Sequence, residues 1–549
     1  MFESIKEFKN KIQEGGYVGL AQINLIAGNL EYNSKKIELF ISQAEEVGLD
    51  LIIFPEFSLM GCEMRDFVKR YPFIIEEEYK HLEELAQLTQ RTAAIVGFID
   101  KDNESSFAVL RWGRLDKTIK RTEYFTSKLL NDGVEYLIRP VSIPSTGCSE
   151  YYRKIYLQDL AKETKRAIVE VNQVGAIDND SYAGFSCVYD ENGELVARAK
   201  GFEEQLLVVN PFRKIGRICD DYIPVPPKSF TLDYEWDLER TYKTLVQGIK
   251  DYFSKCGLKR AVLGLSGGLD STVSAVLLTD ALGKENVFGV SMPSKLTSQE
   301  SKTDAEELAK NLGINFTTLS IKPMFETTNE CLNNLFSEVE KSWDGRYKES
   351  FTPDNIQARS RAIYLWGIAN EFSSCIPIAT SDKSEAYMGY ATINGDMSGG
   401  FAPLIDVTKT KLFALARWMN KNRLEKNAIP ESVLLKRPGA ELAIDPKTGK
   451  TLCAEDALMP YEFLDEIIWR IENKNESYKE LLENEFIYEK KMNLSKEQKI
   501  EWLDKFFRRM SFALYKGYIM PPSVVVEAHN NNKTKYSQPI TSSGINYKN

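Results

Sequence analysis

The residues with the clearest chemical potential form the glycine-rich run Gly264-Leu265-Ser266-Gly267-Gly268-Leu269-Asp270-Ser271. Glycines allow the backbone to come close to a ligand, and exposed N–H groups at the start of a helix favour an anion. Ser266 and Ser271 add hydroxyl donors, and the carboxylate of Asp270 is suited to hold a cation beside phosphate oxygens. The run lacks the Lys-Ser/Thr ending of a Walker loop. It predicts a phosphate site, and an ordinary strand-to-helix turn is the alternative.

The elements that must position this turn can be read from the hydrophobic pattern. A buried strand is expected over 260–263 and a helix over 272–282, with further parallel strands at 287–290 and 376–379. In open α/β sheets, ligands bind beyond the carboxyl ends of the strands, where the glycine-rich turn falls. From about residue 460 the pattern is mostly helical, and it fades into a polar tail near 530–533.

A second set of elements precedes this region. Apolar runs predict strands at 18–22, 51–54, 94–98 and 167–171, and they alternate with helical segments such as 34–47. The proline-rich stretch 223–228 reads as a stiff linker. We therefore predict an α/β domain over 1–222, a linker over 223–236 and a second α/β domain over 237–549.

The composition limits the classes of function. The chain has 549 residues, of which 43% are hydrophobic and 27% charged, as expected for a soluble globular protein of two to four domains. Its net charge of −9, without a basic stripe, argues against a nucleic-acid partner. The N-terminus has no apolar signal segment, and no apolar run is long enough to span a membrane, so a cytoplasmic location is expected.

Cysteine and histidine usage narrows the possible chemistry further. Eight cysteines are scattered without Cys-x-x-Cys pairs, which predicts reduced thiols rather than a disulfide framework or a zinc site. The only two histidines are His81 and His529. Histidine-based catalysis and histidine-rich metal binding are therefore not expected.

Further segments follow the glycine-rich turn in the order and spacing of one family, and with them residues 237–549 resemble NAD+ synthetase, a member of the ATP-pyrophosphatase group. These segments begin at Ser291-Met292-Pro293-Ser294, Asn355-Ile356-Gln357-Ala358-Arg359, Thr380-Ser381-Asp382-Lys383-Ser384-Glu385, Gly389-Tyr390, Gly395-Asp396 and Asp406-Val407-Thr408-Lys409. Each segment alone is weak, whereas the set in this order is specific. The fold that the resemblance implies is a parallel-sheet domain of the adenine-nucleotide α-hydrolase type.

The resemblance implies ATP-dependent amidation of nicotinic acid adenine dinucleotide to NAD+. The pyridine carboxylate attacks the α-phosphate of ATP and pyrophosphate leaves; ammonia then displaces AMP from the acyl-adenylate. An attack of one anion on another needs positive charge and backbone donors nearby. The implied roles are ATP binding and catalysis by Asp270 and Lys409, Mg²⁺ binding by Asp270 and Glu385, and phosphate or nucleotide binding by Ser266, Gly267, Gly268, Ser271 and Thr380. Substrate contacts are implied for Asn355, Arg359, Glu385, Tyr390, Asp396 and Lys516.

The chain departs from the family pattern mainly around the substrate. The family has Asn where this chain has Asp382, Tyr where it has Asn394, Ser where it has Gly439, and Arg where it has Gly517. A related ligase that amidates a different carboxylate is therefore kept as an alternative. A catalytically silent nucleotide-binding regulator is another alternative, although the intact Asp270, Glu385 and Lys409 argue against it.

The amino-terminal part, roughly 16–215, resembles nitrilase-type amidases. Its Leu51-Ile52-Ile53-Phe54-Pro55-Glu56-Phe57 segment matches the turn that carries the general-base glutamate of that family, and Asn172-Gln173-Val174-Gly175 matches a later strand. The resemblance implies an α/β/β/α sandwich. In long NAD+ synthetases, such a domain hydrolyses glutamine through a Glu-Lys-Cys triad and passes ammonia to the synthetase domain.

The nucleophile of this triad is missing from its expected place. The family carries it in a Cys-Glu-Asp-like segment between the lysine region, here Lys117, Lys120 and Arg121, and the Ser142-Ile143-Pro144 strand end. No cysteine lies between Cys62 and Cys148, and Cys187 fits a buried structural thiol. We therefore expect Glu56 to be a relic of the base, or a strand-end carboxylate in a salt bridge.

The expected partners follow from this loss. Ammonia would come from solution or from a separate glutaminase, and the amidase-like domain would serve folding, oligomer contacts or docking. The family resemblance also implies a homo-oligomer built on synthetase-domain dimers.

Overall fold

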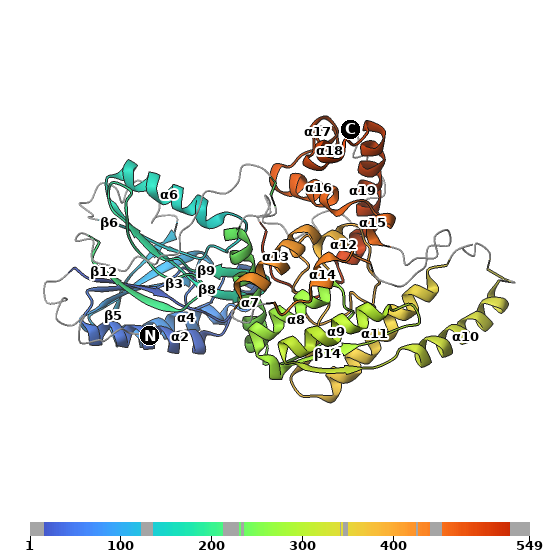
Figure 1. Cartoon of the computed structure of the whole chain (residues 1–549). Coiled ribbons are helices and arrows are strands. Elements are labelled where there is room, and N and C mark those ends of the chain that lie inside the picture. Colours follow the sequence, from blue (N-terminus) through green and yellow to red (C-terminus); the bar gives the residue numbers. More distant parts are fainter. Residues whose placement is uncertain are drawn as a thin grey trace. The chain divides into compact units, whose positions relative to one another are not determined.

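The computed structural model describes residues 16–121, 136–211, 230–231, 235–340, 342–343, 350–423, 427–439 and 453–527. The chain divides into two compact units, a first unit Met1–Pro226 and a second unit Pro227–Asn549 (Figure 1). The proline-rich stretch predicted as a linker and the polar tail predicted near 530–533 lie outside the described residues.

Two sheets form the first unit. The larger has the strand order β12 (Gln205–Val209), β1 (Val18–Gln22), β2 (Leu51–Ile53), β3 (Ala93–Ile99), β4 (Ser105–Arg111) and β5 (Arg114–Lys120). The smaller has the order β11 (Leu195–Arg198), β10 (Cys187–Tyr189), β7 (Ala167–Asn172) and β6 (Tyr136–Val141), and a separate hairpin pairs β8 (Val174–Ile177) with β9 (Asp180–Ala183). The strands predicted at 18–22, 51–54, 94–98 and 167–171 are confirmed.

The two sheets of the first unit pack face to face between helices. Along β1, Val18 and Leu20 join a buried cluster with Val169 and Val171 of β7, whereas Ala21 joins the cluster under the helices. This alternation is the two-residue period of a strand that is covered on both faces. Helices α2 (Leu30–Val47) and α4 (Phe73–Ala86) cover the larger sheet, with the short α3 (Arg65–Arg70) beside them, and α6 (Ser149–Thr164) covers the smaller sheet. The predicted α/β/β/α sandwich is confirmed.

A parallel sheet forms the centre of the second unit. Its order is β15 (Asn315–Thr318), β14 (Val287–Ser291), β13 (Arg260–Gly264) and β16 (Cys375–Pro377), and all three strand pairs are parallel. The chain moves outward from β13 to β15 and then returns to the other side of β13. This reversal of strand order places a ligand crevice at the carboxyl end of β13.

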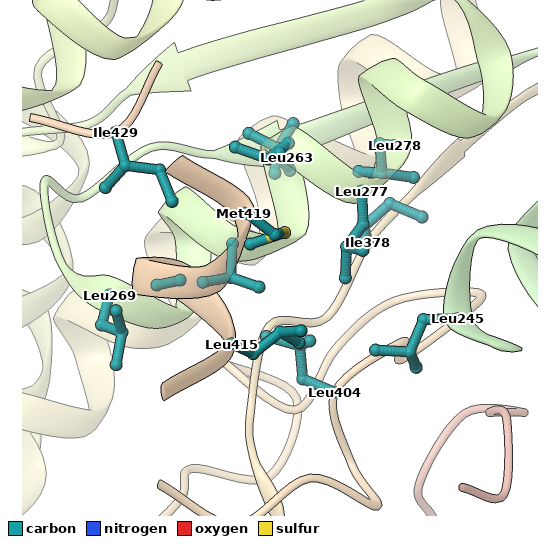
Figure 2. Close-up of a cluster of buried hydrophobic side chains, with 14 of the residues drawn as sticks. Leu245, Leu263, Leu269, Leu277, Leu278, Ile378, Leu404, Leu415, Met419 and Ile429 are labelled. Atoms are coloured by element: carbon teal, nitrogen blue, oxygen red, sulfur yellow. The ribbon is translucent and has the colours of Figure 1, made fainter. Parts of the chain in front are cut away.

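Helices cover both faces of this sheet. Leu263 of β13 packs with α7 (Glu235–Lys255), α8 (Leu269–Leu282), α9 (Gln299–Leu312) and α13 (Lys409–Asn422), whereas Val262 faces Leu365 of α11 (Thr352–Glu371). Figure 2 shows part of the first cluster, with Leu277 and Leu278 of α8 close to Ile378, and Leu415 of α13 close to Leu404. Burying each such leucine stabilises the fold by ~1.5–3 kcal/mol relative to leaving it exposed. This packing holds the first turns of α8 and α13 in place.

The remaining helices complete the second unit. Helices α16 (Tyr461–Lys474), α17 (Tyr478–Glu483) and α19 (Lys496–Gly517) share a buried aromatic cluster, and α18 (Ile487–Met492) contributes Tyr488 at its edge. The shorter or peripheral elements are the 3-10 helix Lys284–Asn286, α10 (Lys322–Val339), α12 (Lys383–Tyr387), α14 (Glu431–Leu435) and α15 (Ala454–Ala457). Among the helices that the structure describes, none combines the length and the apolar character needed to cross a membrane.

A buried carboxyl group in the first unit predicts a pH-dependent stability. Glu78 of α4 is 0% exposed, and its carboxyl group accepts a hydrogen bond from Ile99 N at 3.2 Å. Burial raises the pKa of Glu78 to about 8, and the Ile99 N–H only partly opposes this. Because the folded state holds a proton that the unfolded chain releases, this stabilising contribution is complete below the ordinary glutamate pKa and is lost as the pH rises through about 8.

We expect Glu78→Gln, which keeps the shape and the acceptor oxygen without the charge, to stabilise the first unit more at pH 9 than at pH 6. The difference in free energy of unfolding between Glu78→Gln and the wild type should be larger at pH 9 than at pH 6 by on the order of 2 kcal/mol. Chemical unfolding of the full chain at both pH values measures this difference. The exposed Glu77→Gln on the same helix is the control, and equal stabilisation at both pH values would contradict the prediction.

Candidate active site

The glycine-rich turn lies between the end of β13 at Gly264 and the start of α8 at Leu269. The predicted helix is confirmed, but it begins three residues earlier than expected, so Asp270 and Ser271 belong to its first turn. Ser266 Oγ lies 3.1 Å from Ser271 Oγ and accepts a hydrogen bond from Gly268 N at 3.2 Å. The α8 N-cap, Gly268, has no side chain to bond the first N–H groups of the helix. These donors are therefore available to an anion.

Gly267 can only be glycine. Its φ of +75° lies in the left-handed region, and a Cβ atom there would be 2.1 Å from the Ser301 carbonyl oxygen of α9. The turn therefore rests directly on the backbone of α9's first turn, which fixes its distance from that helix.

Lys409, the first residue of α13, lies at the centre of a carboxylate cluster. Its Nζ is 2.7 Å from Asp270 Oδ1, 2.6 Å from Asp382 Oδ2 and 2.9 Å from Glu385 Oε1, and its side chain is 1% exposed. The first turn of α8 and both ends of the 382–385 segment thus meet at a single ammonium group.

The charges in this cluster shift one another's protonation. Burial alone would lower the pKa of Lys409, but attraction to Asp270, Asp382 and Glu385 outweighs it and raises that pKa well above its ordinary value. Burial raises the pKa of Asp382 and of Glu385, and repulsion among the carboxylates adds to this, whereas Lys409 opposes it. The ammonium therefore stays charged and holds together carboxylates that would otherwise repel one another.

A buried aspartate positions the two segments that carry these groups. Asp465 of α16 accepts hydrogen bonds from Ser384 Oγ at 2.5 Å and from Thr410 N at 2.8 Å. Ser384 Oγ in turn accepts a hydrogen bond from Lys409 N at 2.9 Å, and the Asp382 side chain caps Glu385 N at 2.9 Å. Burial raises the pKa of Asp465 to about 6, opposed by these donors. The starts of α12 and α13 are thereby fixed to each other.

The cluster opens into a cavity of about 250 Å³. Polar and charged residues from separate elements line it: Ser266, Asp270, Ser291, Thr380, Ser381, Glu385, Tyr390, Asp396, Lys409, Arg361, Lys436 and Arg437. The predicted residues Ser266, Gly267, Gly268, Asp270, Thr380, Glu385, Tyr390, Asp396 and Lys409 therefore share one cavity wall. Ser271 lies just behind the wall, with its hydroxyl group on the turn.

Three residues expected at the substrate instead bond the segment 389–396. Thr392 Oγ1 donates to Asn355 Oδ1 at 2.8 Å, Arg359 Nε donates to Ile393 O at 3.1 Å, and Lys516 Nζ donates to Gly389 O at 2.8 Å. The same segment places Tyr390 and Asp396 in the cavity wall. Asn355, Arg359 and Lys516 are not among the cavity-lining residues, and their observed contacts position those that are.

Sequence reasoning did not select Arg361, Lys436 or Arg437 of the cavity, nor Asp382 of the carboxylate cluster beside it. Arg361 lines it together with Ala358, Ala362 and Leu365, which is one face of α11 at helical spacing, whereas Arg359 lies off that face and is exposed. The helical period could have selected Arg361 over Arg359. Asp382 was noted only as a departure from the family, yet it is the third carboxylate of the cluster; its oxygens and those of Asp270 and Glu385 lie within 4.8 Å of one another.

In the first unit, Glu56 is buried at the end of β2 with two observed partners. Ser105 Oγ donates to Glu56 Oε1 at 2.7 Å, and Arg121 Nη1 lies 3.2 Å from the same oxygen. Lys120 pairs instead with Asp102 and with Glu104, the latter at 3.4 Å, which raises the pKa of its ammonium group. Lys117 is exposed on β5.

The cysteines that the structure describes in the first unit are Cys62, Cys148 and Cys187. Cys187 is buried in β10, and burial raises the pKa of its thiol to about 12, so the predicted structural role is supported. Cys148 is the residue before α6, and Cys62 lies in the turn after Gly61, near Tyr182. A catalytic cysteine in this unit would need its thiolate within hydrogen-bond reach of the general base, which in the family is the glutamate at the position of Glu56.

Two family models match the chain: NAD synthase over residues 241–505, and carbon-nitrogen hydrolase over residues 17–114. The glutamine-dependent NAD(+) synthetase of Thermotoga maritima is 33% identical over 530 residues, covering 82% of this chain and 88% of that protein. The enzyme of the same name from Synechocystis sp. is 30% identical over 528 residues, covering 85% and 90%. The glutamine-dependent NAD+ synthetase of Acinetobacter baumannii, solved with ADP, is 26% identical with a TM-score of 0.67, covering 94% of this chain and 97% of that one.

The carboxylate cluster predicts that Lys409 is needed for stability. Lys409→Met would leave three carboxylates without their shared cation, and removal of one partner from a buried ion pair typically costs about 3–5 kcal/mol. We expect the second unit to unfold at a lower denaturant concentration in buffer without divalent ions. Lys421→Met, at an exposed position on the same helix, is the matched control. Unfolding of Lys409→Met at the wild-type denaturant concentration would contradict the prediction.

Proposed function

The chain belongs to the family of glutamine-dependent NAD(+) synthetases, and from this premise we propose that it forms NAD+ with ammonia that its own first unit does not generate. In this proposal the chain is an ATP-dependent NAD+ synthetase that keeps one of the family's two activities, NAD+ synthesis, and lacks the other, glutamine hydrolysis. Synthesis belongs to the second unit, and the glutamine-hydrolysing step of the first unit is lost.

The carboxylate of nicotinic acid adenine dinucleotide attacks the α-phosphate of ATP in the first step, and pyrophosphate leaves. Ammonia then attacks the acyl carbon of the adenylate and AMP leaves, so that the ammonia nitrogen becomes the amide of NAD+. We assign phosphate binding to the N–H groups at the start of α8 and to Ser266, which Ser271 supports from behind, and nucleotide contact to Thr380. Tyr390 and Asp396 line the part of the cavity that we assign to the dinucleotide.

The carboxylates of Asp270, Asp382 and Glu385 fit a magnesium ion. Mg²⁺ prefers hard oxygen ligands, and these three oxygens lie close enough together to share one ion. When bound, the ion would neutralise charge on the phosphate oxygens. Asp270, Asp382 and Glu385 would hold the ion, and Lys409 balances part of the negative charge of the three carboxylates.

The loss of glutamine hydrolysis rests on the surroundings of Glu56. Its carboxylate carries an ion pair with Arg121 and a hydrogen bond from Ser105, and Lys120 is engaged by Asp102 and Glu104. The carbon-nitrogen hydrolase match also ends at residue 114, before the segment in which that family carries its cysteine. A salt-bridged glutamate supports a structural role in place of a general base. A homo-oligomer, a separate glutaminase and a cytoplasmic location stay predictions.

The nitrogen source can be tested directly with the full chain, ATP, Mg²⁺ and nicotinic acid adenine dinucleotide. We expect NAD+ formation with ammonium chloride and at least roughly a hundredfold lower kcat/KM with glutamine, since no triad forms a thioester. Glu56→Gln should leave the ammonia-supported rate unchanged. Glutamine-supported turnover at the ammonia rate that is abolished in Glu56→Gln would overturn the proposal, and so would the absence of NAD+ with either nitrogen source.

A second assay tests the magnesium assignment. Asp382→Asn keeps a side-chain oxygen to cap Glu385 N but removes one negative charge from the cluster. We expect the Mg²⁺ concentration for half-maximal activity to rise by roughly 3- to 10-fold, with a smaller change of rate at saturating Mg²⁺. Glu371→Gln, at the exposed end of α11, is the control for general charge effects. An unchanged Mg²⁺ dependence would show that Asp382 is no ligand.

A further inference from the structure

The positive charge of Lys409 is balanced by the carboxylates of its own cluster. Three carboxylates and one ammonium group leave a net charge of about −2 when all are ionised, so one divalent ion only balances the cluster itself. A bound triphosphate adds several further negative charges, and the pyrophosphate that leaves carries most of them. The cavity must therefore supply additional cations close to the glycine-rich turn.

Among the residues that the structure describes, three basic side chains besides that of Lys409 line the cavity, and they differ in their contacts. Arg361 Nε donates to Met292 O at 3.1 Å, beyond the end of β14. Arg437 lies at an exposed edge, 3.3 Å from Glu455 and 3.0 Å from Asp456. Lys436 is different, because its Nζ donates to Ser301 Oγ on α9.

Ser301 is the residue on which the glycine-rich turn rests. Its carbonyl oxygen occupies the space that a Cβ atom of Gly267 would need, and both residues line the cavity with Lys436. The ammonium group of Lys436 is thus bonded to a residue in direct contact with the turn. It therefore lies at the edge of the proposed phosphate site, next to the first turn of α9.

A second contact holds the segment that carries Lys436. Ser432 Oγ of α14 donates to Asp304 Oδ1 at 2.5 Å, and Asp304 is buried on α9 one turn after Ser301. The pair joins α14 to α9 and so fixes the chain direction at Lys436. A long side chain anchored in this way near the turn loses less freedom on binding an anion than one extending freely into solvent.

From these contacts we infer that Lys436 binds the pyrophosphate end of ATP, and that Asp304 and Ser432 are its positioning residues. Binding of the β- and γ-phosphates would exchange the neutral Ser301 hydroxyl for phosphate oxygens as the acceptors of the lysine. The charge of Lys436 would then stabilise the pyrophosphate as it leaves, while Lys409 serves the cluster around the metal ion. This inference rests on the proposed phosphate site at the glycine-rich turn.

The test compares affinities of the full chain for inorganic pyrophosphate and for AMP by calorimetry in the presence of Mg²⁺. Lys436→Met should weaken pyrophosphate binding by roughly tenfold or more, the loss typical of one charged hydrogen bond, and leave AMP affinity within about twofold. Lys436→Arg should retain part of the affinity, and Ser432→Ala should lose less than Lys436→Met. Lys310→Met, an exposed lysine on α9, is the control and should match the wild type.

Unchanged pyrophosphate affinity in Lys436→Met would overturn the inference. An equal loss for pyrophosphate and AMP would also overturn it, because the lysine would then shape the whole cavity. Ser266→Ala, at a residue of the turn that lines the cavity, separates this result from failure of the underlying site. If Ser266→Ala binds pyrophosphate as tightly as the wild type, the assignment of the turn itself fails, whatever Lys436 does.

Discussion

The second unit depends on one constraint: three carboxylates must share a site with the buried ammonium group of Lys409. Like charges this close repel strongly in a site with little water, and burial adds a further cost for each ion. The ammonium group of Lys409 offsets this cost because it lies within 3 Å of a carboxylate oxygen of Asp270, Asp382 and Glu385. Every element that delivers a member of the cluster is therefore held to the others, and the parallel sheet with its helices is the frame that does so.

The charged groups of the cluster reach the cavity from the starts of three helices. Asp270, Glu385 and Lys409 each lie in the first turn of a helix, where backbone N–H groups have no carbonyl partner within the helix. At α12 and α13, the side chains of Asp382 and Ser384 accept from Glu385 N and Lys409 N, whereas the α8 N-cap has no side chain to do so. For Asp270 and Glu385 the helix dipole favours the negative charge, whereas for Lys409 it does not. The surrounding carboxylates, and the Asp465 contacts to Ser384 and Thr410, outweigh that unfavourable term. The same geometry that stabilises the cluster also leaves donors pointing at an anion.

The sequence allowed much of this to be predicted, within limits that have physical causes. Local patterns predicted the strands at 18–22 and 260–263 and the phosphate turn, because hydrophobic period and glycine placement are local properties. The contact between Lys409 and Asp270 spans 139 positions and was reached only through a family resemblance. Arg359 was preferred to Arg361 because the motif was read without its helical face. The contacts of Asn355 and Lys516 with residues 389–396 depend on how distant segments pack, which no local pattern encodes.

Glu56 in the first unit has contacts that stabilise it independently of any catalytic role. Glu56 is 3% exposed at the end of β2, and an ionised carboxylate at such a position is costly without a partner. Arg121 and Ser105 supply that partnership, so Glu56 stabilises the sheet end whether or not any thiol is nearby. Replacing it with an apolar residue would remove the carboxylate that Arg121 and Ser105 contact. Selection for folding alone is therefore enough to keep this glutamate, and its presence in a sequence does not by itself indicate an active amidase.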